Sequence, residues 1–237
     1  MTLKAQKIRN IGVIMDGNRR WAKAHLLETI LGGHERGAEK FVEFCEWCRD
    51  YDIEHVTVFA FSYENWNRSK FETEGLFRLM ENFYVKKINY CIQNKAKIHI
   101  VGDWSLMSKR SQDVLHEAEK VTSDLHEHTI HAAVSYGGRD EYVRMAKKIA
   151  ADVKDGKLNI DDINQDTIRS YLDLGDAPDI DLVIRTGGDK RLSGFFPFQT
   201  AYSELYFLDT LWPDLTREMF DDVINQYYSK VRINKGK

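Results

Sequence analysis

Residues 11–21 read IGVIMDGNRRW, a pattern that indicates an α/β fold. A short apolar run rich in Ile and Val predicts a buried strand over Ile11–Met15. Asp16 ends the strand, and Gly17 and Asn18 open a helix. Glycine permits close approach of the backbone, and a helix N-terminus favours anions. The stretch therefore predicts a strand–turn–helix unit with an anion site at the turn.

The same alternation of short apolar runs and longer helical patterns continues along the chain. The predicted strands are Ile11–Met15, His55–Phe61, Lys97–Val101, Ile130–Ser135, Asp181–Ile184 and Leu205–Leu208. The predicted helices lie near residues 33–51, 72–94, 107–124, 138–154, 160–173 and 216–229. This order predicts a single α/β domain over residues 1–237, with a six-stranded, mostly parallel sheet flanked by helices.

Composition narrows the class of protein. The chain has 237 residues, of which 43% are hydrophobic, enough for a sizeable core. The net charge of −3 gives no overall attraction to nucleic acid, so we expect no nucleic-acid partner. The polar start MTLKAQKIRN does not resemble a signal peptide, and no run approaches the roughly 18 apolar residues of a spanning helix. With only three cysteines, we expect a cytoplasmic protein.

Polar clusters, three of them containing glycine, follow four of the predicted strands. They occupy residues 16–21, 62–68, 136–139 and 185–193. Ligands of parallel α/β sheets bind at the carboxyl ends of the strands. The four clusters are therefore expected to converge on one edge of the sheet.

The first cluster suits a metal-bound diphosphate. Arg19 and Arg20 add fixed positive charge, and the planar guanidinium fits phosphate oxygens. Asp16 would repel a phosphate unless a cation lay between them, and Mg²⁺ takes few protein carboxylates alongside substrate phosphates. The alternative is that Asp16 merely caps a helix.

The last cluster suits a second anion pocket. Arg185, Arg191 and Ser193 lie in RTGGDKRLS, where two glycines let the turn bend. The alternative is a solvated glycine turn with surface cations. The helix near residues 72–94 carries an apolar stripe, which either walls a hydrocarbon tunnel or simply faces the core. Two anion pockets in an apolar-walled domain point to a two-substrate enzyme of phosphorylated lipids.

Together these stretches resemble the cis-prenyltransferase family, of which bacterial undecaprenyl diphosphate synthase is the familiar member. The matching stretches, in family order, are IGVIMDGNRRWAK, GHERGAE, VTVFAFSYENWNRS, IVGD, SYGGRDE, DLVIRTGGDKRLSGF and AYSELYFLDTLWPD. The resemblance implies a deep apolar tunnel beside the sheet and a homodimer. It also implies a transferase that condenses isopentenyl diphosphate with an allylic diphosphate, such as farnesyl diphosphate, to make a cis-polyprenyl diphosphate.

The resemblance also assigns roles to individual residues. Mg²⁺ is expected on Asp16 and Glu204. The residues expected to bind the allylic substrate or to cover it are Gly17, Asn18, Arg19, Arg20, Trp21, His34, Ser62, Tyr63, Glu64, Trp66 and Arg68. The residues expected to bind isopentenyl diphosphate are Arg185, Arg191, Leu192 and Ser193. Asn65 takes the position to which proton removal is assigned, but an amide is a poor base, so we expect it to orient a water or a diphosphate oxygen.

Several positions depart from the family pattern. Ile30 stands where many members carry an Arg that grips the allylic diphosphate, and residues 196–199 read FPFQ where LLWQ is usual. Asp189 and Ser135 stand where Glu and Asn are common. The family's C-terminal Arg-x-Gly tail, which reaches the partner's site, is only loosely echoed by residues 232–236.

These departures leave two alternative functions open. One is a short-chain or irregular, head-to-middle prenyl diphosphate synthase. The other is a non-catalytic subunit that stabilises an active relative, although Asp16 and Arg191 are both present. A peripheral membrane contact for product release is a further expectation. We interpret Cys45 and Cys48 as structural, and His126, His128 and His131 as lacking the further ligands of a metal site.

Overall fold

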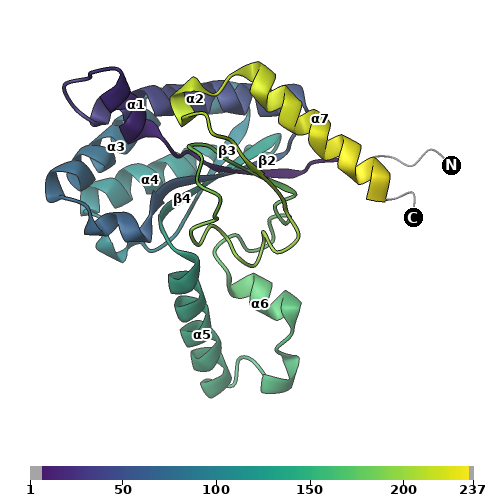
Figure 1. Cartoon of the computed structure of the whole chain (residues 1–237). Coiled ribbons are helices and arrows are strands. Elements are labelled where there is room, and N and C mark those ends of the chain that lie inside the picture. The colour runs from purple at the N-terminus through teal and green to yellow at the C-terminus, as the bar shows by residue number, and fades with distance from the viewer. Residues whose placement is uncertain (1–6, 235–237) are drawn as a thin grey trace.

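A sheet of six parallel strands forms the centre of the computed structural model, which describes residues 7–234 and the side chains of residues 7–230 (Figure 1). The strands are β1 (Asn10–Ile14), β2 (His55–Ser62), β3 (Ala96–Val101), β4 (His128–Tyr136), β5 (Leu182–Arg185) and β6 (Glu204–Phe207). Their order is β3-β4-β2-β1-β5-β6, and every pairing is parallel. The six predicted strands are confirmed, with ends shifted by one or two residues.

Helices follow the strands in chain order. They are α1 (Asn18–Ala24), α2 (Leu31–Asp50), α3 (Lys70–Gln93), α4 (Lys109–Thr122), α5 (Gly138–Lys154), α6 (Gln165–Tyr171) and α7 (Arg217–Asn234). Short 3₁₀ turns are η1 (Tyr63–Asn67), η2 (Trp104–Leu106), η3 (Ile160–Asp162) and η4 (Trp212–Asp214). The prediction of one helix over residues 160–173 is wrong, because Asn164 starts a new helix there by accepting from the N–H groups of Asp166 and Thr167.

Two apolar cores pack against the sheet. The larger lies on the face covered by α2, α3, α4 and α7, where Phe44, Phe77, Leu115 and Phe220 are all buried. The smaller lies on the other face and contains Tyr136, Phe195 and Phe196 together with strand residues. Because both faces are covered, all five residues of β1 are buried, as its apolar sequence predicts.

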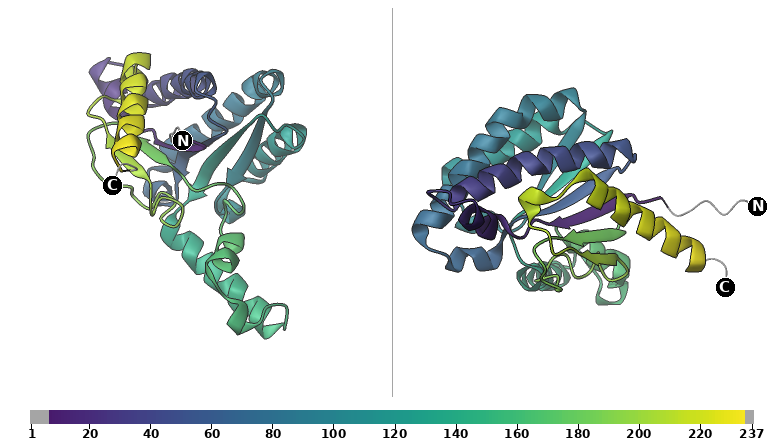
Figure 2. Two further views of the ribbon diagram at one scale, coloured as in Figure 1. Left: turned by 90° about the vertical axis from the view of Figure 1, so that its right-hand side faces the viewer. Right: turned by 45° about the horizontal axis from the view of Figure 1, so that its top comes forward.

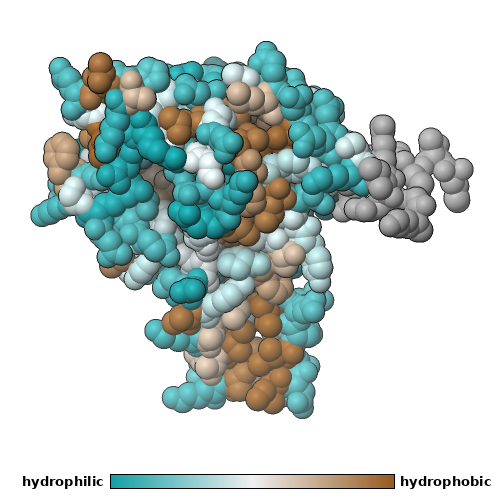
Figure 3. Space-filling model, viewed as in Figure 1, coloured by the Kyte–Doolittle hydropathy of each residue, from teal (hydrophilic) through white to brown (hydrophobic). Residues whose placement is uncertain are grey.

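Helices α5 and α6 project away from the sheet as an arm (Figures 1 and 2). The arm carries exposed apolar side chains, including Val143 at 52% and Ile160 at 67% of full exposure. Figure 3 shows brown residues over this part of the surface. No helix within the described residues combines the length and the apolar character needed to cross a membrane.

A row of three histidines crosses the sheet on the face away from α2 and α3. His131 of β4 is buried, and its ring nitrogens lie 3.0 Å from ring nitrogens of His55 and of His99. Burial, and then the neighbouring histidines, hold the pKa of His131 well below its usual value. Burial likewise lowers the pKa of His55 and of His99. The folded protein therefore keeps this row neutral in conditions where the unfolded chain binds protons.

The free energy of unfolding is therefore expected to fall as the pH drops below about 6.5, the ordinary histidine value. Above that pH the three histidines are neutral in both the folded and the unfolded protein, so they no longer make the free energy of unfolding depend on pH. Urea unfolding at pH 7.5 and pH 5.5 measures this loss of stability in the wild type and in His131→Gln. The glutamine keeps a polar side chain but cannot titrate. The variant should lose less stability on acidification, and equal losses in both proteins would refute the interpretation.

Candidate active site

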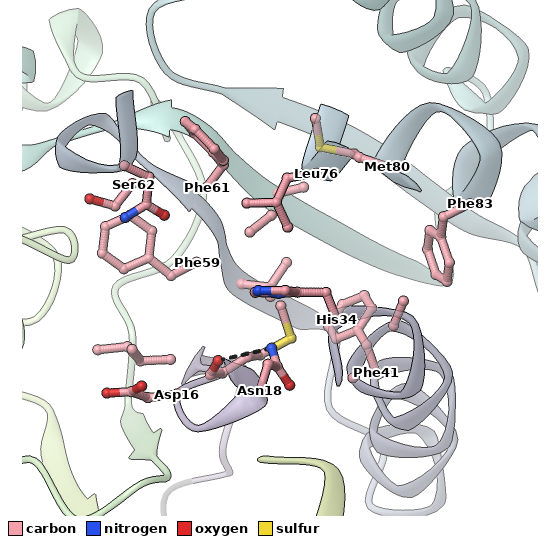
Figure 4. Close-up of a pocket in the computed structure, with 18 of the residues that line it drawn as sticks. Asp16, Asn18, His34, Phe41, Phe59, Phe61, Ser62, Leu76, Met80 and Phe83 are labelled. Carbon is pink, nitrogen blue, oxygen red and sulfur yellow. Dashed lines mark hydrogen bonds between the residues drawn. The ribbon is translucent and has the colours of Figure 1, made fainter. Parts of the chain in front are cut away.

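The carboxyl edge of the sheet opens into one deep cavity. It has a volume of about 760 Å³, within the range of ligand sites. All four predicted strand-end clusters contribute to its lining, through Asp16 after β1, Ser62 at the end of β2, Arg139 after β4 and Arg185 at the end of β5. The predicted convergence is therefore confirmed, and Figure 4 shows Asp16, Asn18 and Ser62 at the polar end of the cavity.

More than half of the predicted site residues line this cavity. They are Asp16, Asn18, His34, Ser62, Glu64, Asn65, Arg68, Arg185, Arg191 and Ser193. The chain thus brings together residues that lie up to about 180 positions apart in the sequence.

Asp16 and Arg185 form the central ion pair. Arg185 is the last residue of β5, and its side chain is only 5% exposed. Its Nη2 lies 2.9 Å from Oδ2 of Asp16, and its Nη1 donates to the Ser193 hydroxyl at 2.9 Å. A buried guanidinium is stable only with such partners. The pair therefore fixes the turn after β5 against the end of β1.

The turn after β5 packs closely on the first cluster. Gly187 has a φ of 87°, and a Cβ built there would lie 2.4 Å from Nη2 of Arg20 and 3.2 Å from the backbone of Asp16. The Thr186 hydroxyl donates to the backbone carbonyl of Asp16 at 2.7 Å. A side chain at position 187 would therefore be strained by the positive φ, would displace the Arg20 guanidinium and would crowd the backbone of Asp16.

The carboxylate of Asp189 pairs with the arginine side chains of this turn. Its carboxylate accepts from Arg191 at 2.7 and 2.9 Å and lies 3.4 Å from Arg185. A diphosphate bound by Arg185 and Arg191 would compete with this carboxylate, because all are anions seeking the same donors.

A second set of charges gathers around Glu72. Glu72 is 5% exposed and accepts from Arg68 at 3.0 Å, and Arg19 lies 3.6 Å from the same oxygen. Ser69 caps the start of α3 by accepting from the N–H of Glu72. Glu72 therefore links the loop before α3 to the helix that follows Asp16.

His34 lies in α2 beside these arginines and faces the cavity (Figure 4). Burial, with added repulsion from Arg68 and Arg19, lowers its pKa to about 4. Its Nε2 is buried and has no hydrogen-bond partner. His34 is therefore a neutral ring with a free polar atom, suited to contacting a polar ligand without carrying charge.

Apolar side chains form the rest of the cavity wall. Helix α3 contributes Leu76, Met80, Phe83 and Tyr84 at helical spacing, and α2 contributes Phe41. Figure 4 shows Leu76, Met80, Phe83 and Phe41 on the side away from Asp16. Both interpretations of the α3 stripe hold in part: it walls the cavity, and its Tyr84 and Cys91 also belong to the larger core.

Other predicted residues do not line the cavity. Gly17, Arg19 and Arg20 are outside the lining, although Arg20 lies 3.5 Å from the Asp16 carboxylate. Trp21 turns away, donating to Asp214 at 2.7 Å and stacking on His25 at 4.0 Å.

Three further predicted site residues pack against other parts of the protein and do not line the cavity. Trp66 stacks on Phe77 and donates to Ser135, so it anchors the loop after β2. Tyr63 lies against Gly137, and Leu192 packs on the smaller core.

Glu204 lies far from Asp16 within the chain. It begins β6, pairs in register with Leu182 at the start of β5, and bonds to Lys230 at 3.0 Å. Asp16 follows the end of β1, and parallel strands place starts and ends at opposite edges of a sheet. A single chain therefore does not combine these two carboxylates at one metal.

The described residues include no group of three or more His, Cys, Asp or Glu side chains placed to hold a metal ion. Asp16 nonetheless fits Mg²⁺, because its carboxylate lines the cavity, is 32% exposed and stands beside the guanidiniums of Arg185 and Arg20. Mg²⁺ needs only one or two carboxylates when substrate phosphates supply further oxygens.

Sequence reasoning did not single out every residue of the site. Arg139 lines the mouth, and its only signal was its place in the cluster after β4. Glu72 lies at the start of the helix predicted near residues 72–94, and the signals for its role are the Ser69-x-x-Glu72 capping spacing and Arg68 one turn before it.

Comparison with known proteins agrees with the geometry. The family described as "Putative undecaprenyl diphosphate synthase" matches residues 14–234. An isoprenyl transferase of Aquifex aeolicus is 40% identical over 232 residues, which cover 98% of this chain and 96% of that protein. A tritrans,polycis-undecaprenyl-diphosphate synthase (geranylgeranyl-diphosphate specific) of Thermoplasma acidophilum is 38% identical over 231 residues, covering 97% and 89%.

A solved structure is similar as well. Lavandulyl diphosphate synthase from Lavandula x intermedia, in complex with dimethylallyl diphosphate, superposes with a TM-score of 0.89 at 32% identity, covering 94% of this chain and 95% of that one. Fold, site and relatives together define a prenyltransferase. The chain belongs to the cis-prenyltransferase family of undecaprenyl diphosphate synthase.

In the ligand-free protein, the His34 ring is expected to titrate near pH 4, because protonation would bury a charge beside two guanidiniums. NMR shifts of the ring nitrogens, followed from pH 7.5 to pH 3.5, measure the titration midpoint of His34. The signal that disappears in His34→Gln is assigned to this ring. A midpoint at or above about 6.5, the ordinary value, would contradict the proposed burial.

Proposed function

We propose that this prenyltransferase condenses isopentenyl diphosphate onto an allylic prenyl diphosphate, such as farnesyl diphosphate, in a Mg²⁺-dependent reaction that yields a cis-polyprenyl diphosphate. The observation that carries the proposal is the cavity itself. Anion-binding groups ring its mouth, and apolar side chains of α2 and α3 wall its depth. A phosphorylated lipid has the same division into a charged head and an apolar tail.

The chain's own residues bind and orient the two substrates. Arg185, Arg191 and Ser193 hold the diphosphate of isopentenyl diphosphate, while Asn18 and Arg68, which also line the cavity, bind the allylic diphosphate. A bound Mg²⁺ on Asp16 would neutralise charge that develops on the departing diphosphate. Holding both reactants in one cavity removes much of the entropic cost of their encounter.

The bond changes follow from this placement. The terminal alkene carbon of isopentenyl diphosphate bonds to C1 of the allylic chain, whose C–O bond to diphosphate breaks. C2 of the isopentenyl unit then loses a proton to a water or a diphosphate oxygen. Asn65 lines the cavity and its amide orients that acceptor.

Irregular head-to-middle coupling or a short product is a second candidate. The similarity to lavandulyl diphosphate synthase favours it, as does Ile30 at the start of α2. The FPFQ segment at residues 196–199 does not favour irregular coupling, because Phe196 lies outside the cavity lining. Its side chain is fully buried in the smaller core, stacked on Tyr136 at 4.1 Å.

A non-catalytic stabilising subunit is less well supported. Asp16, Arg185 and Arg191 are present and gathered in one cavity.

A homodimer remains part of the proposal. The apolar side chains on the α5–α6 arm support it, as does β6, an edge strand on which Leu205 is 39% exposed. Joint metal binding by Asp16 and Glu204 would need Glu204 from a second copy. The tail at residues 232–236 lies outside the residues whose side chains are described. Cytoplasmic location and peripheral membrane contact remain predictions.

Purified protein given labelled isopentenyl diphosphate, farnesyl diphosphate and Mg²⁺ should form longer prenyl diphosphates, and chelation of the metal should stop the reaction. Mass spectrometry of the dephosphorylated products identifies them. A regular long polyprenol excludes irregular coupling. No incorporation with any of dimethylallyl, geranyl, farnesyl or geranylgeranyl diphosphate would reject the proposed function.

Asp16→Asn should lower turnover by about two to three orders of magnitude, the usual cost of removing one group that stabilises developing charge. The change keeps the side chain's shape, so circular dichroism should stay that of the wild type. Asp50→Asn is the matched control, because it breaks another Arg–Asp pair, with Arg217 at 2.6 Å, outside the cavity lining. Full activity in Asp16→Asn would show that this carboxylate has no part in the reaction.

A further inference from the structure

Four guanidiniums line the cavity, and they differ in the negative charge already placed beside them. The four belong to Arg68, Arg139, Arg185 and Arg191. Three of them form salt bridges, whereas Arg139 is exposed and forms none with the residues whose side chains are described. Arg139 therefore presents its full charge to an anion that enters the cavity.

The arginines expected to bind isopentenyl diphosphate are partly neutralised by the protein itself. Arg185 lies 2.9 Å from Asp16, and Arg191 lies 2.7 Å from Asp189. Asp189 also lies 3.4 Å from Arg185. A diphosphate can take both guanidiniums only if it displaces the Asp189 carboxylate, which accepts charge-assisted hydrogen bonds of the same kind.

Helix α5 places Arg139 next to this pocket. Gly138 begins α5, and its N–H donates to the Gly194 carbonyl at 3.0 Å, directly after Ser193. A Cβ built on Gly138 would lie 2.6 Å from that carbonyl oxygen and 2.5 Å from Pro197, so only glycine allows this approach. The start of α5 is therefore fixed against the turn that carries Ser193, and Arg139 is the next residue.

The two carboxylates that follow Arg139 in the sequence are held elsewhere. Asp140 accepts from Arg144 at 2.8 Å. Glu141 is 1% exposed and accepts from the Tyr136 hydroxyl at 2.6 Å. Because both carboxylates have these partners, the charge of Arg139 stays open to a ligand.

We propose that Arg139 takes up the diphosphate of incoming isopentenyl diphosphate first, before that diphosphate displaces Asp189 from Arg185 and Arg191. The proposal rests on the proposed function and deepens it, because it names the residue that begins binding at the same pocket. A diphosphate held by Arg139 reaches Arg191 while Asp189 is still paired. One anion then replaces the other, and the buried guanidinium of Arg185 is never left without a partner.

Arg139→Gln removes the charge and keeps a polar side chain. Its affinity for isopentenyl diphosphate, measured by calorimetry without allylic substrate, should fall about tenfold, the size expected for one hydrogen bond to a charged group. Inorganic pyrophosphate should lose about as much, because the contact is to the diphosphate. Arg139→Lys keeps the charge without the planar fork and should recover part of the loss.

Turnover separates binding from chemistry. In Arg139→Gln the KM for isopentenyl diphosphate should rise by a similar factor, and kcat should keep its wild-type value, because Arg139 acts before the bond changes. A fall in kcat with an unchanged KM would overturn the proposal.

Arg78→Gln is the matched control. Arg78 on α3 is also exposed and without a salt bridge to the residues whose side chains are described, but it lies outside the cavity lining. The substitution changes the net charge by the same amount and should leave both affinities at the wild-type value. Equal losses in the two variants, or no loss in Arg139→Gln, would overturn the proposal.

The exchange with Asp189 gives a second test. Asp189→Asn removes the competing carboxylate, so a diphosphate can reach Arg191 directly. Arg139→Gln should therefore cost less affinity in the Asp189→Asn background than in the wild type. The same fold loss in both backgrounds would contradict the proposed exchange.

These binding measurements do not depend on turnover. A wild type that binds isopentenyl diphosphate but incorporates none would reject the proposed function, and the calorimetry would still decide the role of Arg139. A wild type that binds neither isopentenyl diphosphate nor pyrophosphate would overturn both.

Discussion

Arg185 is buried at the edge of the sheet, and the site depends on how its charge is balanced. Its guanidinium is 5% exposed and lies 2.9 Å from Oδ2 of Asp16, so the pair holds the ends of β5 and β1 together. Because β1 and β5 are neighbours in register, this pair brings together two clusters about 170 residues apart. The same guanidinium is a ready donor for a diphosphate, which would compete with Asp16 and Asp189 for it.

The apolar depth of the site follows from the helices that begin at this edge. Helices α2 and α3 approach closely where Gly75 leaves room for Leu31, and they are joined again through the hydrogen bonds of Tyr90 with Glu46 and Arg49. Between these two points small and apolar side chains leave the cavity open. The charged mouth therefore leads directly into a hydrocarbon-sized space, a division that matches the chemistry of a prenyl diphosphate.

Local pattern and parallel topology were enough to predict much of this. Short runs of Ile and Val marked the strands, and the carboxyl-edge rule gathered Asp16, Ser62 and Arg185. What local pattern could not predict depended on tertiary packing. Trp66 and Leu192 pack inward, Trp21 turns toward Asp214, and Glu204 lies at the other edge because its strand starts there. The arrangement of Tyr90 with Glu46 and Arg49 depends on how two helices cross, which no spacing in the sequence reveals.

A crystal structure with isopentenyl diphosphate and a non-reactive allylic diphosphate analogue would show directly which residues hold each diphosphate and where the allylic tail lies. We expect one diphosphate within hydrogen-bond distance of Arg185, Arg191 and Ser193, the other near Asn18 and Arg68, and the allylic tail between α2 and α3. Diphosphates bound away from Arg185, or a tail lying outside the cavity with Asp16 and Arg185 still paired, would contradict it.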